Sequence, residues 1–83
     1  MNANDFNPHT PLSSLAPGIC ATITDIHTDD ALRQRLMALG FRSGKSVEII
    51  RKASFGGPIQ VRIGTTDILL RLSEAAKIEV RSA

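Results

Sequence analysis

A single amphipathic helix followed by a run of short strands is the pattern that most constrains the fold of this chain. Leu32, Leu36 and Leu39 recur at i, i+4 and i+7, so they form one apolar stripe that we expect to pack into a core. Gly40 stands where a helix needs a left-handed residue in order to end, and Phe41 follows it. A chain with only one such helix must build the rest of its core from sheet.

The start of this helix is marked by capping and acidic residues. Thr28 or Asp29 can act as the N-cap, and Asp29 and Asp30 place negative charge at the positive end of the helix dipole. These signals fix the helix to the segment between residues 29 and 40.

Alternating apolar residues predict five strands around the helix. The first spans residues 19–27, and its alternation breaks at Ile26, which predicts a bulge near Asp25. The other four strands are centred on residues 47–50, 59–63, 67–72 and 78–81, with turns at residues 55–58 and 64–65 and one helical turn at residues 73–76.

The order of these elements predicts a mainly β fold with one short helix. It is typical of an SH3-like small five-stranded β-barrel with the helix between strands 1 and 2, because an antiparallel set this small buries its apolar face by curling. An OB-like barrel is the alternative, but its helix usually falls between strands three and four. Residues 1–10 are polar and predict a flexible N-terminal tail, so the single domain is expected at residues 11–83. Within that domain, residues 11–15 predict a turn whose two leucines cover the core.

Size and composition argue against several classes of function. The chain has 83 residues, a net charge of +2 and no Trp or Tyr, which weakens any interpretation based on stacked nucleic-acid bases. Cys20 is the single cysteine, so it forms no internal disulfide and suits a reducing cytosol. No apolar stretch approaches the roughly 20 residues that span a bilayer, and the first residues lack the pattern of a secretory signal. We therefore expect a cytoplasmic protein.

The chain resembles a known family over residues 11–82. The residues that carry the resemblance are, in order, Leu12, Leu15, Gly18, Ile23, Ile26, Leu32, Arg35, Leu36, Leu39, Gly40, Phe41, Gly44, Val47, Gly57, Pro58, Leu70, Arg71, Glu74 and Ala75. This ordered set is similar to ferrous-iron transport protein A (FeoA). The same small barrel occurs at the C-terminus of iron-dependent repressors, which carry a DNA-binding domain ahead of it, so the stand-alone FeoA family is the better match.

The resemblance implies a non-enzymatic, cytoplasmic accessory or regulatory protein of the bacterial ferrous-iron uptake system. Its implied partner is the cytosolic GTPase part of the FeoB transporter, so it would reach the membrane only through that partner. The family supplies no catalytic residue and no cofactor. Two alternatives stay open: a small-barrel nucleic-acid-binding protein, for which the chain shows no specific signal, and a metal- or peptide-binding sensor module like the repressor domain.

Met37 is the residue of the helix that packing does not explain. It lies about 100° round the helix from Leu36, on the polar face. Single exposed apolar residues are common, yet the flexible thioether of methionine also suits protein contacts. The hypothesis is that Arg33, Met37 and Arg42 form a docking face for the transporter's cytosolic part, and the commoner alternative, an ordinary surface, stays open.

Cys20, His27 and His9 are the soft metal-ligand candidates, and their spacing predicts no metal site within one chain. Cys20 and His27 are seven residues apart, which is not a chelating spacing, even with carboxylates such as Asp25 nearby. A weak homodimer, with or without a metal bridge through His27, is left open.

Three predicted strands carry arginines at outward positions: Arg62, Arg71 and Arg81. We interpret them as a solvated basic face rather than a nucleic-acid surface. Leu69 also points away from its apolar neighbours, and we expect the N-terminal segment to cover it, because small barrels protect their edges.

Overall fold

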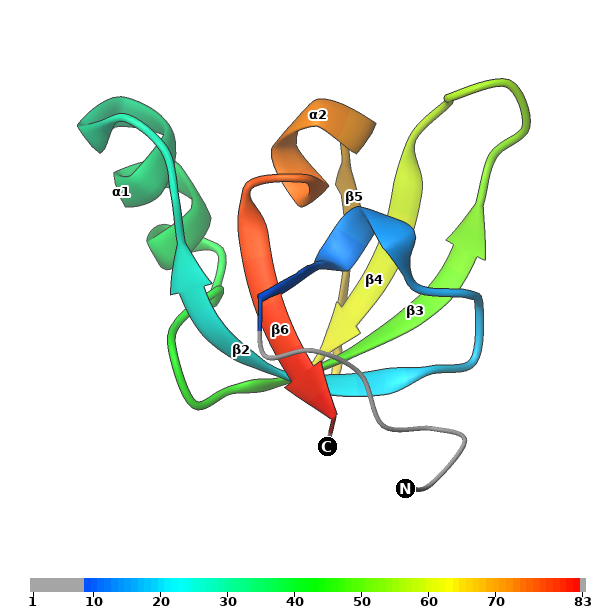
Figure 1. The fold of residues 1–83 in the computed structure, drawn as a ribbon, viewed down its shortest axis with the longest axis horizontal. Helices are drawn as coiled ribbons and strands as arrows, with labels where there is room; N and C mark the ends of the chain where they lie inside the picture. The colour runs from blue at the N-terminus through cyan, green and yellow to red at the C-terminus, as the bar shows by residue number, and fades with distance from the viewer. Residues whose placement is uncertain (1–8, 83) are drawn as a thin grey trace.

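The computed structural model describes residues 9–82, which form one antiparallel sheet curled around a core, with a helix at one side (Figure 1). The elements in chain order are β1 (Thr10–Pro11), a 3₁₀ turn η1 (Leu12–Ser14), β2 (Cys20–Ile26), α1 (Asp30–Ala38), β3 (Ser46–Lys52), β4 (Ile59–Ile63), β5 (Thr66–Leu70), α2 (Leu72–Ala75) and β6 (Ile78–Ser82). The strand order is β1-β6-β2-β3-β4-β5. The predicted mainly β fold, with its helix between the first two long strands, is confirmed. Neither helix within residues 9–82 has the length and apolar character to cross a membrane.

The two-residue strand β1 is an element that the sequence pattern did not predict. Thr10 pairs with Val80, and Pro11 pairs with Glu79. A strand this short has no alternation to detect, so the five predicted strands correspond to β2–β6 and β1 is a sixth. It lies at the predicted boundary between tail and domain; residues 1–8 of the predicted tail lie outside the described part of the chain.

The bulge predicted near Asp25 is present in β2. Ile23 pairs with Val80, while Asp25 pairs with Glu79, so β2 has one residue more than β6 across this interval. This extra residue allows Ile23 and Ile26, which are three positions apart, both to face the core. Such bulges also increase the local twist, which helps a small sheet to curl.

One hydrophobic core fills the space inside the curled sheet. Leu12 and Leu15 cover one end of it, which confirms the prediction for residues 11–15. The buried residues are Leu12, Leu15, Ala21, Ile23, Ile26, Leu36, Phe41, Val47, Ile49, Ile59, Val61, Leu70, Ala75, Ile78 and Val80. Every strand from β2 to β6 contributes at least one of them, so the core forms only when all five strands are in place.

The predicted apolar stripe of α1 is only partly correct. Leu36 is fully buried and Leu32 is half-buried against the core, but Leu39 is 42% exposed. The prediction for Leu39 is wrong because α1 ends one residue before it, so Leu39 is the C-cap rather than part of the regular helix. Phe41, after the glycine turn, fills the core beneath the helix instead.

Both ends of α1 carry the stop signals that the sequence predicted. Asp29 is the N-cap, and its Oδ1 accepts a hydrogen bond from the Leu32 N–H at 2.9 Å. At the other end, Gly40 has a φ of +107° and its N–H donates to the Met37 carbonyl, while the Phe41 N–H donates to the Leu36 carbonyl at 3.0 Å. This pair of bonds is the Schellman motif, which ends a helix and sets an apolar contact across the turn.

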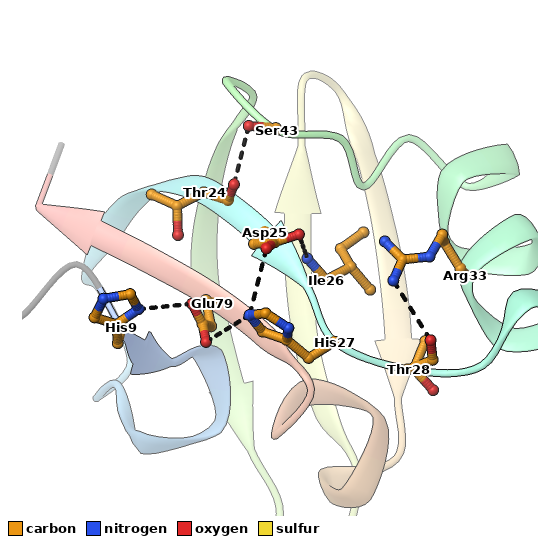
Figure 2. Close-up of polar contacts among 9 residues, drawn as sticks. All are labelled: His9, Thr24, Asp25, Ile26, His27, Thr28, Arg33, Ser43 and Glu79. Atoms are coloured by element: carbon orange, nitrogen blue, oxygen red, sulfur yellow. Dashed lines mark hydrogen bonds and ion pairs between the residues drawn. The ribbon is translucent and has the colours of Figure 1, made fainter.

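Glu79 on β6 joins segments that lie far apart in the sequence (Figure 2). Its Oε1 lies 3.0 Å from His9 Nδ1, and its Oε2 lies 2.8 Å from His27 Nε2. The same His27 nitrogen is 3.4 Å from Asp25 Oδ2. A hydrogen bond from His9, and to a lesser extent one from His27, lowers the pKa of Glu79, because both favour the charged carboxylate. The cluster therefore links the residue before β1 to the junction between β2 and α1.

Truncating Leu36 should cost far more stability than truncating Leu39. We expect Leu36→Ala to lower the free energy of unfolding by about 2–5 kcal/mol, since it leaves a cavity in the core. Leu39→Ala should change it by less than about 1 kcal/mol, because the side chain is largely in solvent. Urea denaturation of both variants measures this difference, and equal losses would contradict the placement of Leu39.

The stability should fall as the pH drops through the lowered pKa of Glu79. A folded-state pKa below the unfolded value means that the carboxylate stabilises the fold above the ordinary glutamate pKa, and that this contribution disappears as the pH falls through the lowered pKa. Glu79→Gln should therefore melt below wild type near neutral pH and show a flatter profile as the pH is lowered through the glutamate range. Glu48→Gln, on β3, is the control and should keep the wild-type slope. Parallel profiles for wild type and Glu79→Gln would rule out this role.

Candidate docking surface

Arg33, Met37 and Arg42 line one hollow on the surface of the molecule. The hollow lies between the exposed side of α1 and the end of β2, has a volume of about 160 Å³, and includes Ile26 and Phe41 in its lining. The three residues predicted as a docking face are thus brought together in space. Whether this face binds a partner stays a prediction.

The turn after α1 holds Arg42 in place at the edge of this hollow. The Schellman ending directs the chain back across β2, where the Gly44 N–H donates to the Ile23 carbonyl at 2.7 Å. Ser43 Oγ donates to the Thr24 carbonyl at 3.0 Å (Figure 2). The backbone on both sides of these contacts is fixed to the sheet, so Arg42 is presented from a well-supported loop.

The hollow combines apolar side chains with two arginines, and Asp25 and Ser43 also line it. Met37 is 39% exposed, so its thioether is available to a partner while part of it covers the hollow. Arg33 is half-buried, and its Nη2 donates to the Thr28 carbonyl at 3.4 Å, whereas Arg42 is exposed. Guanidinium groups bind carboxylates in a directed way, and a thioether packs against apolar side chains.

The metal-ligand candidates do not gather into one centre. Cys20 begins β2, opposite Glu48, whereas His27 follows the other end of that strand. His9 and His27 do lie close together, but both bond the carboxylate of Glu79. Within residues 9–82, no group of three or more His, Cys, Asp or Glu residues could hold a metal ion.

Glu79 is the member of this cluster that sequence reasoning missed. The sequence placed His27 near Asp25, which is correct, but Glu79 comes from the last strand of the chain. Only the pairing of β2 with β6 puts it there, with Asp25 opposite Glu79 in the register. The alternation of β6 alone would have placed Glu79 on the outward face without naming a neighbour.

The outward arginines are exposed, as expected for a solvated face, but one of them is neutralised. Arg62 Nε donates to Asp67 Oδ1 at 2.7 Å, and its Nη2 donates to Oδ2 at 3.1 Å. The hydrogen bond between these groups is the main cause that raises the pKa of Arg62 and lowers the pKa of Asp67. Lys52 is turned inward, and its Nζ donates to two backbone carbonyls in residues 13–15 at 2.7 and 3.1 Å. The basic character is therefore reduced to scattered charges.

Leu69 is not covered by the described N-terminal residues, so that expectation is wrong for them. The side chain is 69% exposed. The reason is topological: β1 pairs with β6, at the opposite edge of the sheet from β5. The segment that was expected to cover Leu69 covers the other side of the barrel instead.

The sequence is similar to a known protein family over nearly the whole chain. Residues 10–82 match the family model described as the FeoA domain. A Fe(2+) transport protein A/Fe(2+) transporter FeoB fusion protein of Porphyromonas gingivalis is 35% identical over 69 residues, which are 83% of this chain and 8% of that protein. A putative Fe(2+) transport protein A of Campylobacter jejuni is 32% identical over 69 residues, which are 83% of this chain and 93% of that protein. The chain thus spans a small part of the fusion protein and nearly all of the Campylobacter protein.

The fold also matches a solved structure of this kind. The Stenotrophomonas maltophilia FeoA complexed with zinc, described as a prokaryotic SH3 domain protein, has a TM-score of 0.70 and 37% identity, covering 83% of this chain and 86% of that one. The predicted SH3-like class is confirmed by this similarity. Since the family model matches nearly the whole chain and both named relatives exceed 30% identity, the chain belongs to the FeoA domain family.

Proposed function

We propose that this chain is a non-enzymatic accessory protein of ferrous-iron uptake that binds the cytosolic GTPase part of an FeoB-type transporter. The observation that supports this most is the Porphyromonas gingivalis protein, in which a region 35% identical to this chain belongs to the same polypeptide as an FeoB transporter. Fusion raises the effective concentration of one module near the other, which is an advantage for modules that bind each other. The chain would then work in the cytoplasm and reach the membrane only through its partner.

The hollow beside α1 is the surface that we assign to this contact. Its lining offers the thioether of Met37 to an apolar side chain, with Arg33 and Arg42 at hand for a neighbouring carboxylate. Apolar anchors with charged neighbours are typical of the central part of protein interfaces.

A binding role also agrees with the chemistry that the described residues offer. The thiol of Cys20 lies at the opposite end of β2 from His27, so the two do not form a nucleophile with its base. His9 and His27 both contact the Glu79 carboxylate, and these contacts stabilise the fold. We therefore propose no catalytic residue and no cofactor.

The proposed contact does not depend on a bound metal. The Stenotrophomonas maltophilia relative was solved with zinc. In this chain, His27 Nε2 lies 2.8 Å from the Glu79 carboxylate, and His27 does not line the hollow that we assign to the contact. A metal-bridged homodimer is therefore not part of the proposal.

Met37→Asp should weaken binding to the purified cytosolic part of the FeoB-type transporter from the same organism. We expect Kd to rise by about tenfold or more, because the substitution places a carboxylate in an apolar contact and competes for the two guanidinium groups. Met37→Leu keeps the apolar contact and should bind like wild type. Calorimetric titration with and without GTP, on variants with wild-type melting temperatures, measures the effect.

The outcomes of this titration separate the two parts of the proposal. Wild type that fails to bind in either nucleotide state would overturn the proposed function. Wild type that binds, together with a folded Met37→Asp variant of unchanged Kd, would leave the function standing and remove the hollow beside α1 as its docking surface.

A further inference from the structure

The turn between β3 and β4 carries an aromatic residue that neither local structure nor the core explains. Phe55 and Gly56 have φ values of 58° and 74°, and the Gly57 N–H donates to the Ser54 carbonyl at 3.2 Å. Two successive left-handed residues are the geometry of a type I′ turn, where Asn, Asp or Gly are preferred. Phenylalanine is sterically disfavoured in this conformation. Its side chain is nevertheless held completely in solvent, at 107% exposure.

The hairpin that carries Phe55 is built rigidly. The Ala53 N–H donates to the Pro58 carbonyl at 3.0 Å, which closes the hairpin below the turn. A Cβ on Gly57 would lie only 2.7 Å from Ala53 Cβ. The two sides of the hairpin therefore approach so closely that position 57 requires glycine. A strained and exposed residue on a rigid support points to a functional constraint rather than to a packing need.

A groove opens directly beside this turn. The ladder between β4 and β5 ends at the pair Ile59 and Leu70. The next residue on one side is Pro58, which has no N–H to continue the ladder, and the next on the other side is Arg71, which begins α2 as its N-cap. The two segments therefore separate beyond the ladder. They leave a hollow of about 500 Å³, lined by Gly56, Gly57, Pro58, Arg71, Leu72 and Ser73.

Apolar and cationic groups surround this groove. Leu72 is 36% exposed at its wall, and the exposed Phe55 directly precedes Gly56, which also lines the groove. Arg71 lines the groove, and Arg51 is on the same hairpin; both are exposed, and within residues 9–82 neither forms an ion pair. The groove thus offers an apolar wall and uncompensated positive charge.

The acidic residues of this region are already engaged. Glu74 pairs with Arg35, and its Oε1 accepts a hydrogen bond from the Arg71 N–H at 2.9 Å. Asp67 is held by Arg62. In a symmetric dimer with this groove at its two-fold axis, each Arg71 would lie close to its own equivalent. The charges therefore favour an acidic partner of a different kind over a second copy.

We propose that this groove binds a short acidic and apolar segment of the FeoB-type transporter's cytosolic part, with Phe55 and Leu72 on its apolar side chain and Arg71 on its carboxylate. The inference rests on the proposed function and adds a second contact to it. In the view of Figure 1, the β3–β4 turn, α2 and α1 lie at the same end of the barrel. The ion pair between Arg35 and Glu74 joins α1 to α2, but Arg35 lies about 200° round α1 from Arg33 and Met37, so the groove would be a contact separate from the hollow beside α1.

Phe55→Asn tests the proposal without damaging the fold. Asparagine accepts the left-handed conformation, so the melting temperature should stay the same or rise. The Kd for the transporter's cytosolic part should increase by about tenfold, because the aromatic anchor is lost. Leu69→Asn is the matched control: it removes another exposed apolar side chain, from β5 rather than from the turn that borders the groove, and should bind like wild type. Arg71→Glu should also weaken binding and reduce its dependence on salt.

Each outcome decides the inference. Wild-type binding with an unchanged Kd for Phe55→Asn would overturn the groove as a contact while the proposed function stands, whereas absence of wild-type binding would remove the function itself. Sedimentation equilibrium and co-sedimentation with phosphatidylglycerol vesicles test the other occupants. A wild-type dimer, or vesicle binding, that Phe55→Asn abolishes would overturn the assignment to the transporter. Tenfold weaker binding by Phe55→Asn with neither effect would support it.

Discussion

The turn that ends α1 is the constraint on which the rest of this structure depends. The Phe41 N–H donates to the Leu36 carbonyl, and this bond sets two fully buried side chains next to each other in the core. Leu36 is the buried residue that α1 itself contributes, so the helix is attached to the sheet largely through this pair. The same turn sends Arg42 and Ser43 back over β2, which creates the hollow. One local motif therefore seats the helix and shapes the surface beside it.

Periodicity in the sequence was enough to predict the elements that repeat and the places where they stop. The strands, the bulge near Asp25 and the glycine end of α1 all have local signals, and each is present. The exposure of Leu39 has no such signal. Leu39 and Phe41 both suit the space under the helix, and the choice between them depends on where the last helical turn ends. The exposed Leu69 likewise depends on which edge of the sheet the chain start joins, which is a long-range pairing.

The two candidate surfaces also differ in how far the sequence alone predicts them. Arg33, Met37 and Arg42 could be grouped from the sequence, since helical spacing and one glycine turn are enough to bring them together. The groove beside Phe55 could not, because its walls come from two separate segments and their separation depends on where the β4–β5 ladder ends. Nor does a turn at residues 55–58 reveal from its letters that the aromatic residue, rather than a glycine, takes the first left-handed position.

The place of β6 in the sheet has a consequence for how the protein is made. The last strand of the chain lies between β1 and β2, and it supplies Ile78 and Val80 to the core. During synthesis β1 has no partner, and the barrel no complete interior, until the final residues of the domain have left the ribosome. The barrel is therefore completed only when translation of the domain is finished, and its core stays open to solvent on the β6 side until then.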